Sequence, residues 1–370
     1  MKIVGVNHSG YNTTRNISSL PFKNFKVEKK RDFFKFPEHL YYRITGRTHP
    51  LLFNLHQDFG LAHCDLWHFF NTVSFTSKPW ITTFETMTPR FHGKYQEKGV
   101  KLLAGKHCKK LIGMSEMAKN LQLDFIKMKY PDYYDAIAAK TIFIHPAQKL
   151  LLKDYSDKKS EDVLNFILVG TEFFRKGGAE VLTVFNKLLN EGKNIKLRIV
   201  SGMQYENSYA TQDDYNKAME IINRHKENII YHSFLPNNEV LEFLLKSHVA
   251  LLPSYRETYG YSILEAQASG CPVITTNILA FDEINNNNIG WMVNVPIDVM
   301  KRPLINSKEE REKFSEAIIE GLDKHIREIL NNSAGVRTKA IAAMEKIKMQ
   351  HNPEKVAEQL EQIYNLALSE

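Results

Sequence analysis

Two glutamates, Glu257 and Glu265, lie eight positions apart in the stretch ETYGYSILEAQASG, which the apolar segment CPVITT follows. In one continuous helix their side chains would start about 12 Å apart along the axis and about 80° apart around it. Gly260 lies between them and makes a break in the helix the better interpretation. We therefore predict a loop from Glu257 to Gly260 and a helix that begins near Tyr261 or Ser262.

This arrangement suits a ligand that carries both phosphate and hydroxyl groups. The free backbone N–H groups and the dipole at a helix start attract an anion such as a phosphate. A carboxylate inside the helix, as Glu265 would be, can accept hydrogen bonds from the hydroxyls of a ribose. On spacing alone, a surface position for Glu265 and a plain loop charge at Glu257 are the simpler interpretation.

Apolar runs and amphipathic segments alternate along the whole chain. We predict strands at 2–7, 64–70, 79–85, 110–115, 140–147, 164–170, 195–202, 229–236 and 248–255. The intervening segments predict helices, for example at 116–127, where Ser115 is suited to cap the first turn. Strands that alternate with helices indicate an α/β fold with parallel sheets covered on both faces.

The length of 370 residues predicts two domains. The polar stretch 150–162 interrupts the alternation of strands and helices, and we place the linker there. We therefore predict one domain at 1–155 and a second at 156–350. The last helical pattern, at 351–370, is expected to pack back on the first domain.

Composition excludes several classes of protein. The hydrophobic fraction of 43% and the charged fraction of 25% are typical of a folded globular chain. No apolar run reaches the roughly 18 residues that a spanning helix needs, and the N-terminal apolar part is too short for a signal peptide. Cys64, Cys108 and Cys271 are far apart, which argues against disulfides and a zinc site and favours the cytoplasm.

Charge is unevenly spread along the sequence. Residues 1–150 hold 23 lysines and arginines against 11 acidic residues, a net charge of +12. The remainder holds 26 against 31, a net charge of −5. This asymmetry suggests an anionic partner for the first half, such as a membrane surface, a phosphorylated lipid or nucleic acid, although solubility alone explains it equally well.

The block VALLPSYRETYGYSILEAQASGCPVITTN is similar to the signature of the family 4 retaining glycosyltransferases. Glu257 and Glu265 match their E-x7-E motif with the spacing intact. The resemblance implies the GT-B fold, in which two Rossmann-like, doubly wound domains face a cleft. It also implies that Glu265 holds the ribose of a nucleotide sugar and that Glu257 holds the donor sugar. The neighbouring nucleotide contacts would come from Thr258, Tyr259, Gly260, Tyr261 and Ser262.

A second block, FILVGTEFFRKGG, resembles the first strand and loop of the nucleotide-sugar domain in that family. There a basic residue before a glycine contacts the diphosphate, and Lys176 and Gly177 match it. With Arg175 as the second cation, the two charges would clamp the diphosphate and offset the leaving group's charge without a metal. Gly170 would lie beside them. The family often has an arginine after this glycine, where this chain has Thr171. A solvated basic turn is the alternative interpretation.

Further site candidates follow from the same resemblance. The segment IIYHSFLPNNEVLEFL resembles the part that cradles the nucleobase and implies contacts at Ser233, Phe234 and Leu235. In the first half, DLWHFFN and KPWITTFETMTPRF resemble strands near the donor sugar or acceptor, which makes His68, Glu85 and Arg90 candidates, with Gly10 in the first glycine loop. Glu85 stands where the family usually has a histidine, and it would either bind a sugar hydroxyl or pair with Arg90. His68 is more often a core residue in such a position.

Residues 22–36, FKNFKVEKKRDFFKF, combine six lysines and arginines with five phenylalanines. This mixture suits a membrane interface or an anionic acceptor, and also single-stranded nucleic acid. The resemblance favours the membrane, because many relatives extend lipid-linked sugars on its cytoplasmic face. A basic surface loop with buried phenylalanines is the alternative.

We conclude from the sequence that the chain resembles a metal-independent, retaining hexosyltransferase of polysaccharide or glycoconjugate synthesis. It would move a sugar from a nucleoside diphosphate, with UDP or GDP expected, to a sugar or lipid-linked saccharide, and it would use no other cofactor. The first domain would face the acceptor, and the second would bind the nucleotide sugar. We expect a cytoplasmic protein that binds peripherally to the inner membrane face. The alternatives are a nucleotide-sugar-binding protein without transfer activity and, less favoured, a nucleic-acid-binding protein.

Overall fold

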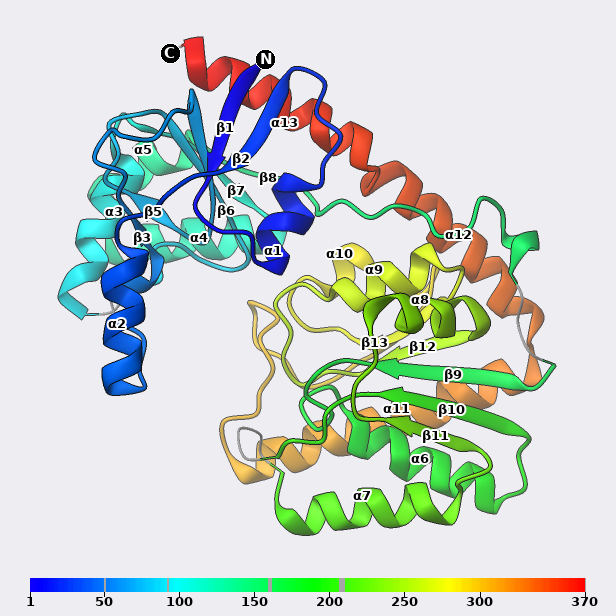
Figure 1. The fold of residues 1–370 in the computed structure, drawn as a ribbon. Coiled ribbons are helices and arrows are strands. Elements are labelled where there is room, and N and C mark those ends of the chain that lie inside the picture. The colour runs from blue at the N-terminus through cyan, green and yellow to red at the C-terminus, as the bar shows by residue number, and fades with distance from the viewer. Residues whose placement is uncertain (50, 92, 159–161, 206–209, 370) are drawn as a thin grey trace. The chain divides into compact units, whose positions relative to one another are not determined.

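The chain folds into two units, each built around its own parallel β-sheet (Figure 1). The computed structural model describes residues 1–49, 51–91, 93–158, 162–205 and 210–369. Unit 1 comprises Met1–Ala147 and His351–Glu370, and unit 2 comprises Gln148–Gln350. The polar stretch that the sequence marked as a linker therefore falls within unit 2, and its residues 159–161 lie outside the described residues.

The sheet of unit 1 has six strands in the order β2-β1-β4-β6-β7-β8, and all neighbours are parallel. The strands are β1 Lys2–Val6, β2 Phe25–Lys29, β4 Leu66–Phe70, β6 Trp80–Phe84, β7 Cys108–Gly113 and β8 Thr141–Phe143. A small parallel pair, β3 Leu55–His56 and β5 Val73–Ser74, lies apart from this sheet. The order in which strands are added to the sheet reverses at β1, because β2 pairs with one edge of β1 and β4 pairs with the other edge.

Helices cover both faces of this sheet. The helices are α1 Tyr11–Thr13, α2 Lys35–Thr45, α3 Gln96–Ala104, α4 Glu116–Lys129, α5 Tyr134–Ala138 and α13 Pro353–Ser369. Short helical turns lie at η1 Thr14–Ser18, η2 Leu52–Asn54, η3 Gly93–Tyr95 and η4 Pro131–Tyr133. One core joins Trp67, Phe69 and Trp80 to residues of α3 and α4. The second core lies beneath α13 and includes Leu360 and Tyr364.

Unit 2 has a six-stranded parallel sheet in the order β11-β10-β9-β12-β13-β14. Its strands are β9 Leu164–Val169, β10 Ile195–Val200, β11 Ile229–His232, β12 Val249–Leu252, β13 Val273–Thr276 and β14 Trp291–Val293. This is the strand order of a Rossmann sheet, in which the direction of winding reverses between the first and fourth strands, here β9 and β12. Ligands of such sheets bind at that switch point, beyond the carboxyl ends of the strands.

The helices of unit 2 form two layers around the sheet (Figure 1). They are α6 Gly178–Asn190, α7 Gln212–Arg224, α8 Asn237–Lys246, α9 Tyr261–Ala268, α10 Phe281–Ile284, α11 Lys308–Asn331 and α12 Ala334–Gln350, with a helical turn η5 at Tyr155–Asp157. Helix α6 packs against α7 and α11, whereas α9 packs against α8 and α12. The prediction of two doubly wound parallel sheets is confirmed. No helix in the described part of the chain is long and apolar enough to cross a bilayer.

Candidate functional site

The glutamate pair of the opening stretch lies at the switch point of unit 2. Glu257 is in the loop after β12, and Glu265 lies inside α9, which begins at Tyr261 with Gly260 as its N-cap. The predicted break at Gly260 is confirmed, because this residue has a φ of +97°, which residues other than glycine rarely adopt. Glu265 is buried, and Glu257 is largely buried.

Lys176 comes to the same place from the loop after β9, because β9 and β12 are neighbours in the sheet. Its Nζ atom forms an ion pair with the Oε2 atom of Glu257, 81 positions away in the chain. Burial, and next the charge of Arg175, lower the pKa of the Lys176 ammonium, while the Glu172 carboxylate opposes this shift. A cation held with little water around it is well placed to attract a phosphate group.

Gly177 explains why the backbone of the two loops can meet. It has a φ of +76°, and a Cβ atom here would lie 2.3 Å from the carbonyl oxygen of Pro253. A side chain would therefore push the loop after β9 away from the loop after β12 and separate Lys176 from Glu257. The second loop is held from its other side, because the Thr276 hydroxyl donates to the Ser254 carbonyl oxygen at 2.9 Å.

Arg175 makes different contacts from its neighbour Lys176. Its guanidinium donates to the carboxylate of Glu172 and, at 2.7 Å, to the carbonyl oxygen of Arg256. Its own carbonyl oxygen accepts from the Tyr255 N–H at 3.0 Å. These contacts tie the two loops together. In this structure Arg175 thus braces the loop that carries Glu257, and it lines a pocket of its own.

The remaining nucleotide candidates lie at three strand ends of the same sheet edge. Gly170 and the exposed Thr171 directly follow β9. Ser233, Phe234 and Leu235 follow β11, which is two strands away from β9 in the sheet. Thr258 and Tyr259 continue the loop after β12, and Tyr259 is buried. The structure therefore places the phosphate, ribose and base candidates along one edge of unit 2.

In unit 1, the Glu85 carboxylate is the centre of a polar cluster at the ends of β4 and β6. It accepts hydrogen bonds from Asn12 Nδ2 at 3.1 Å, Asn71 Nδ2 at 3.3 Å and Arg90 Nη2 at 2.7 Å. Glu85 and Arg90 thus form an ion pair within unit 1. Sequence analysis missed Asn12 and Asn71. In the sequence, the only signal for Asn71 was its position just after a predicted strand. In the structure it has a φ of +53°, which asparagine adopts more readily than most residues.

Two further candidates of unit 1 differ in exposure. Gly10 is exposed and precedes α1, where its N–H lies 3.4 Å from His8 Nδ1. His68 is fully buried, with Nδ1 2.7 Å from the Tyr364 hydroxyl and Nε2 2.8 Å from the Thr83 hydroxyl. Both ring nitrogens are satisfied inside the core, so His68 is no candidate for direct ligand contact. Its role is to hold α13 against the sheet.

Comparison with known proteins gives a family match over most of unit 2. Residues 152–333 match the family model described as "Glycosyl transferases group 1". The chain is 26% identical over 209 residues to the capsular polysaccharide biosynthesis glycosyltransferase CapM of Staphylococcus aureus, covering 56% of this chain and 47% of CapM. The matched part therefore spans less than half the length of that relative. The match over residues 152–333 bears out the resemblance at the level of the family.

Solved structures extend the likeness to both units. A glycosyltransferase from Rickettsia africae matches with a TM-score of 0.62 and 14% identity, over 99% of this chain and 90% of that one. Anabaena Alr3699/HepE in complex with UDP and glucose matches with a TM-score of 0.62 and 11% identity, over 99% of both chains. With two Rossmann-like units in one chain, the fold is therefore of the GT-B class.

Proposed function

We propose that the protein is a retaining glycosyltransferase that moves a sugar from a nucleoside diphosphate to a saccharide or lipid-linked saccharide. The observation that carries this proposal is the Lys176–Glu257 pair at the switch point of unit 2, with Glu265 in the adjacent helix α9. Lys176 and the start of α9 would hold the diphosphate, Glu265 the ribose and Glu257 the sugar. The name of the relative CapM supports a role in polysaccharide synthesis.

The chemistry would rest on stabilising the leaving group. When the bond between the anomeric carbon and the phosphate oxygen breaks, its electron pair stays on the phosphate, and the charge of Lys176 would stabilise it. The acceptor hydroxyl would then attack from the same face and give its proton to the departing phosphate. This ion-pair-like step needs no covalent intermediate, and we propose that it needs no metal. The protein would contribute positioning and electrostatic stabilisation.

Binding of the donor is tested by thermal shift against UDP, GDP, ADP and their sugar conjugates in the presence of EDTA. Stabilisation by one nucleotide family is expected from linkage. The structure in complex with UDP and glucose that this chain resembles favours UDP. A folded protein that none of these compounds stabilises would contradict the proposal. If transfer is then detected, the anomeric configuration of the product by NMR distinguishes retention from inversion.

The Glu85 cluster favours a second candidate function, a nucleotide-sugar-binding protein without transfer activity. The Glu85 carboxylate is occupied by three donors within unit 1, and it stands where relatives are expected to have a histidine. A site that lost transfer would keep nucleotide binding, because the nucleotide candidates all lie in unit 2. Nucleotide stabilisation without turnover, across a broad acceptor panel, would favour this candidate.

We also propose that unit 1 contacts an anionic membrane surface from the cytoplasmic side through helix α2. None of the residues of α2, all of which the structure describes, is buried. Phe36 and Ile44 are 77% and 75% exposed and share one face with Leu40, because the three are spaced four apart. Arg43 and the following Arg47 are exposed beside this face. Apolar and basic groups together suit a helix that lies in the headgroup region of an anionic bilayer.

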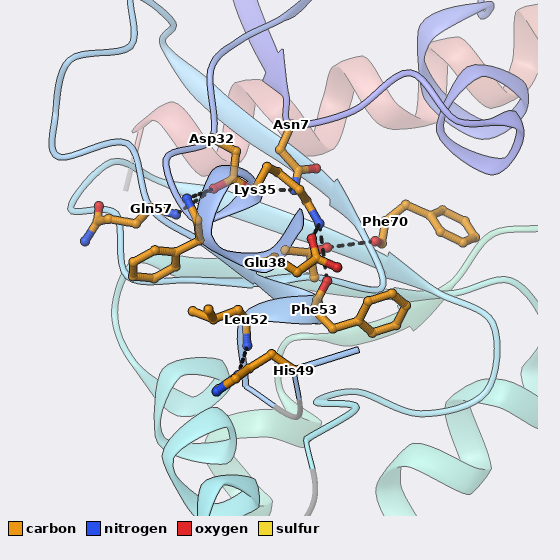
Figure 2. Close-up of polar contacts among 11 residues, drawn as sticks. Asn7, Asp32, Lys35, Glu38, His49, Leu52, Phe53, Gln57 and Phe70 are labelled. Atoms are coloured by element: carbon orange, nitrogen blue, oxygen red, sulfur yellow. Dashed lines mark hydrogen bonds and ion pairs between the residues drawn. The ribbon is translucent and has the colours of Figure 1, made fainter. Parts of the chain in front are cut away.

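Figure 2 shows how the first turn of α2 is fixed to the rest of unit 1. Lys35 pairs with Glu38 at 3.0 Å and donates to the Phe53 carbonyl oxygen at 3.3 Å. Just before the helix, Asp32 accepts from Asn7 Nδ2 at 3.1 Å and from the Gln57 N–H at 3.3 Å. These contacts orient the helix while leaving its apolar face outside. The basic aromatic segment at 22–36 is divided by the fold, since Phe25 is a buried residue of β2.

A further inference from the structure

Unit 2 contains a pocket of about 660 Å³ beside the donor site, and among its described lining residues Arg175 alone was a candidate for the donor site. The N-terminal ends of α6, α7 and α11 surround it, and Figure 1 shows these three helices on one face of the sheet. Its described lining residues are Phe174, Arg175, Ala179, Glu180, Ala210, Asp214, Tyr255, Arg256, Lys308, Arg311, Glu312 and Ser315. The volume is within the range of small-molecule sites.

The lining includes four cations, namely Arg175, Arg256, Lys308 and Arg311. The Arg311 side chain is oriented by the carbonyl oxygens of Ile305 and Asn306, at 3.3 and 3.4 Å from Nη1. Lys308 is largely exposed, and its Nζ atom lies 3.6 Å from Glu312. Arginine and lysine side chains that converge on one pocket are the usual means of binding phosphate.

All three acids in the pocket have partners within unit 2, since Glu312 lies near Lys308 and the other two accept hydrogen bonds. Asp214 caps α7, because its Oδ2 atom accepts from the Thr211 N–H at 2.8 Å and from the Thr211 hydroxyl at 2.7 Å. The buried Glu180 accepts from the Tyr255 and Ser315 hydroxyls, both at 2.7 Å, and burial raises its pKa. The lining therefore has four cationic side chains against three acidic ones, and burial favours the neutral form of one of these acids, Glu180.

The pocket and the donor site share the loop after β12. Tyr255 and Arg256 line the pocket, and the next residue, Glu257, pairs with Lys176 in the donor site. Arg175 also belongs to both, since it lines the pocket, binds the Arg256 carbonyl oxygen and directly precedes Lys176. An anion that attracts Arg175 or Arg256 would therefore displace the backbone that positions the Lys176–Glu257 pair.

We propose that this pocket binds a small phosphomonoester, such as a sugar phosphate, and that its occupancy changes the affinity of the donor site for nucleotide. The pocket volume leaves room for a sugar-sized group beyond the phosphate. The regulatory part of this inference rests on the proposed function, whereas binding in the pocket does not.

Isothermal titration with inorganic phosphate, glucose 6-phosphate and uncharged glucose tests the site on the full chain. Inorganic phosphate and glucose 6-phosphate should bind, and glucose should not. The double variant Lys308→Ala/Arg311→Ala should weaken binding roughly tenfold or more, because charge-assisted hydrogen bonds are lost. Lys313→Ala, on the exposed side of the same helix, should leave it unchanged. Absence of binding, or equal binding by the double variant, would overturn the proposal.

A second comparison separates this pocket from the donor site. Lys176→Ala should weaken nucleotide binding and leave phosphomonoester binding intact. The double variant Lys308→Ala/Arg311→Ala should weaken phosphomonoester binding and leave nucleotide binding intact. If Lys176→Ala alone abolishes phosphomonoester binding, the compound occupies the donor site and the pocket proposal fails. If both ligands bind, each must alter the affinity of the other by the same factor. Equal nucleotide affinity with and without the phosphomonoester would overturn the regulatory link.

Discussion

Lys176 and Glu257 come from two loops that the sequence separates by 81 positions, and the sheet of unit 2 brings them into direct contact. Each side chain supplies the opposite charge that allows the other to be buried. An unpaired buried ammonium would be costly, and so would a carboxylate with little access to water. When a diphosphate enters, its negative charge would compete with Glu257 for the same lysine, which would leave Glu257 able to accept a hydroxyl of the sugar.

Replacing Lys176 by alanine should reduce turnover by roughly 10²-fold or more, because one charge that stabilises the leaving group is lost. Steady-state kinetics with the donor identified by thermal shift will measure it. Lys187→Ala is the matched control, since this lysine is exposed on α6 and pairs with Asp323. Normal turnover in Lys176→Ala would remove Lys176 from the site.

Replacing Glu265 by glutamine should mainly weaken nucleotide binding, because a charged acceptor for the ribose hydroxyls becomes a neutral one. A roughly tenfold rise in the Kd is expected from the usual strength of such hydrogen bonds. Calorimetric titration with the nucleotide measures this, and the exposed Glu316→Gln on α11 serves as the control. A larger effect on 2′-deoxynucleotide binding than on ribonucleotide binding would contradict the ribose assignment.

Helix α13 shows how an element can belong to a unit that is distant in the sequence. Its apolar side covers the sheet of unit 1. Its Glu361 carboxylate accepts from the Asn24 N–H at 2.8 Å and from Asn24 Nδ2 at 2.7 Å. Tyr364 binds His68 beneath it. Charge-assisted and buried polar contacts of this kind fix the position of a helix that apolar contacts alone would hold less specifically.

His68 makes this docking sensitive to acid. Burial lowers the pKa of His68 to about 3, whereas an exposed histidine in the unfolded chain titrates near 6.5. Between these values only the unfolded chain binds the proton. The free energy of unfolding should therefore be highest above about pH 6.5 and fall as the pH decreases, by up to about 1.4 kcal/mol per pH unit for this one group.

Chemical denaturation of His68→Gln between pH 4.5 and 7.5 will measure this contribution. The variant should be less stable at pH 7 and lose part of the pH dependence. Some of the dependence should remain, because burial also lowers the pKa of His56, to about 4. The exposed His63→Gln variant is the control. An unchanged slope in His68→Gln would show that His68 does not carry the acid sensitivity.

Helix α2 provides a second test at the scale of one element. Full-length protein should sediment with vesicles that contain anionic lipid and bind neutral vesicles weakly. The double variant Phe36→Ser/Ile44→Ser should lose most of this binding, because the two most exposed large apolar side chains of α2 are removed. Phe234→Ser, which removes a phenylalanine that is 79% exposed in unit 2, is the matched control. Equal losses in both variants would contradict a specific role for α2.

At the scale of the whole molecule, the chain passes between the units twice, after Ala147 and after Gln350. Unit 2 is one continuous segment and contains every candidate for nucleotide contact. Unit 1 is discontinuous and needs α13 to cover one face of its sheet. Nucleotide binding by unit 2 should therefore not depend on the packing of α13 against the sheet of unit 1.

Residues 148–350 expressed alone should fold and keep the nucleotide affinity of the full chain, without transferring sugar. Thermal shift and calorimetry will measure folding and binding. Residues 1–147 should be unstable alone, because Leu360 and Tyr364 no longer cover the sheet, and a fusion with residues 351–370 should restore folding. Failure of folded 148–350 to bind a nucleotide that the full chain binds would place essential contacts in unit 1.

The sequence by itself determined the elements that have a local physical signal. Continuous apolar runs marked β9 and β12, Ser115 marked the start of α4, and Gly260 marked the start of α9. Strand β2 and helix α2 were missed. The charged residues of β2 at the sheet edge and the exposed apolar residues of α2 do not follow the periodicity of buried elements.

Only the tertiary structure decided which of these local features meet. Strand order brought Lys176 to Glu257, and the return of the chain to unit 1 buried His68 under Tyr364. The same folding placed Asn12, Asn71 and Arg90 as hydrogen-bond donors around the Glu85 carboxylate. It also placed Arg175 in the lining of the pocket between α6, α7 and α11. Such contacts depend on sheet topology and side-chain packing over long sequence separations, and the periodicity of a single sequence records neither of them.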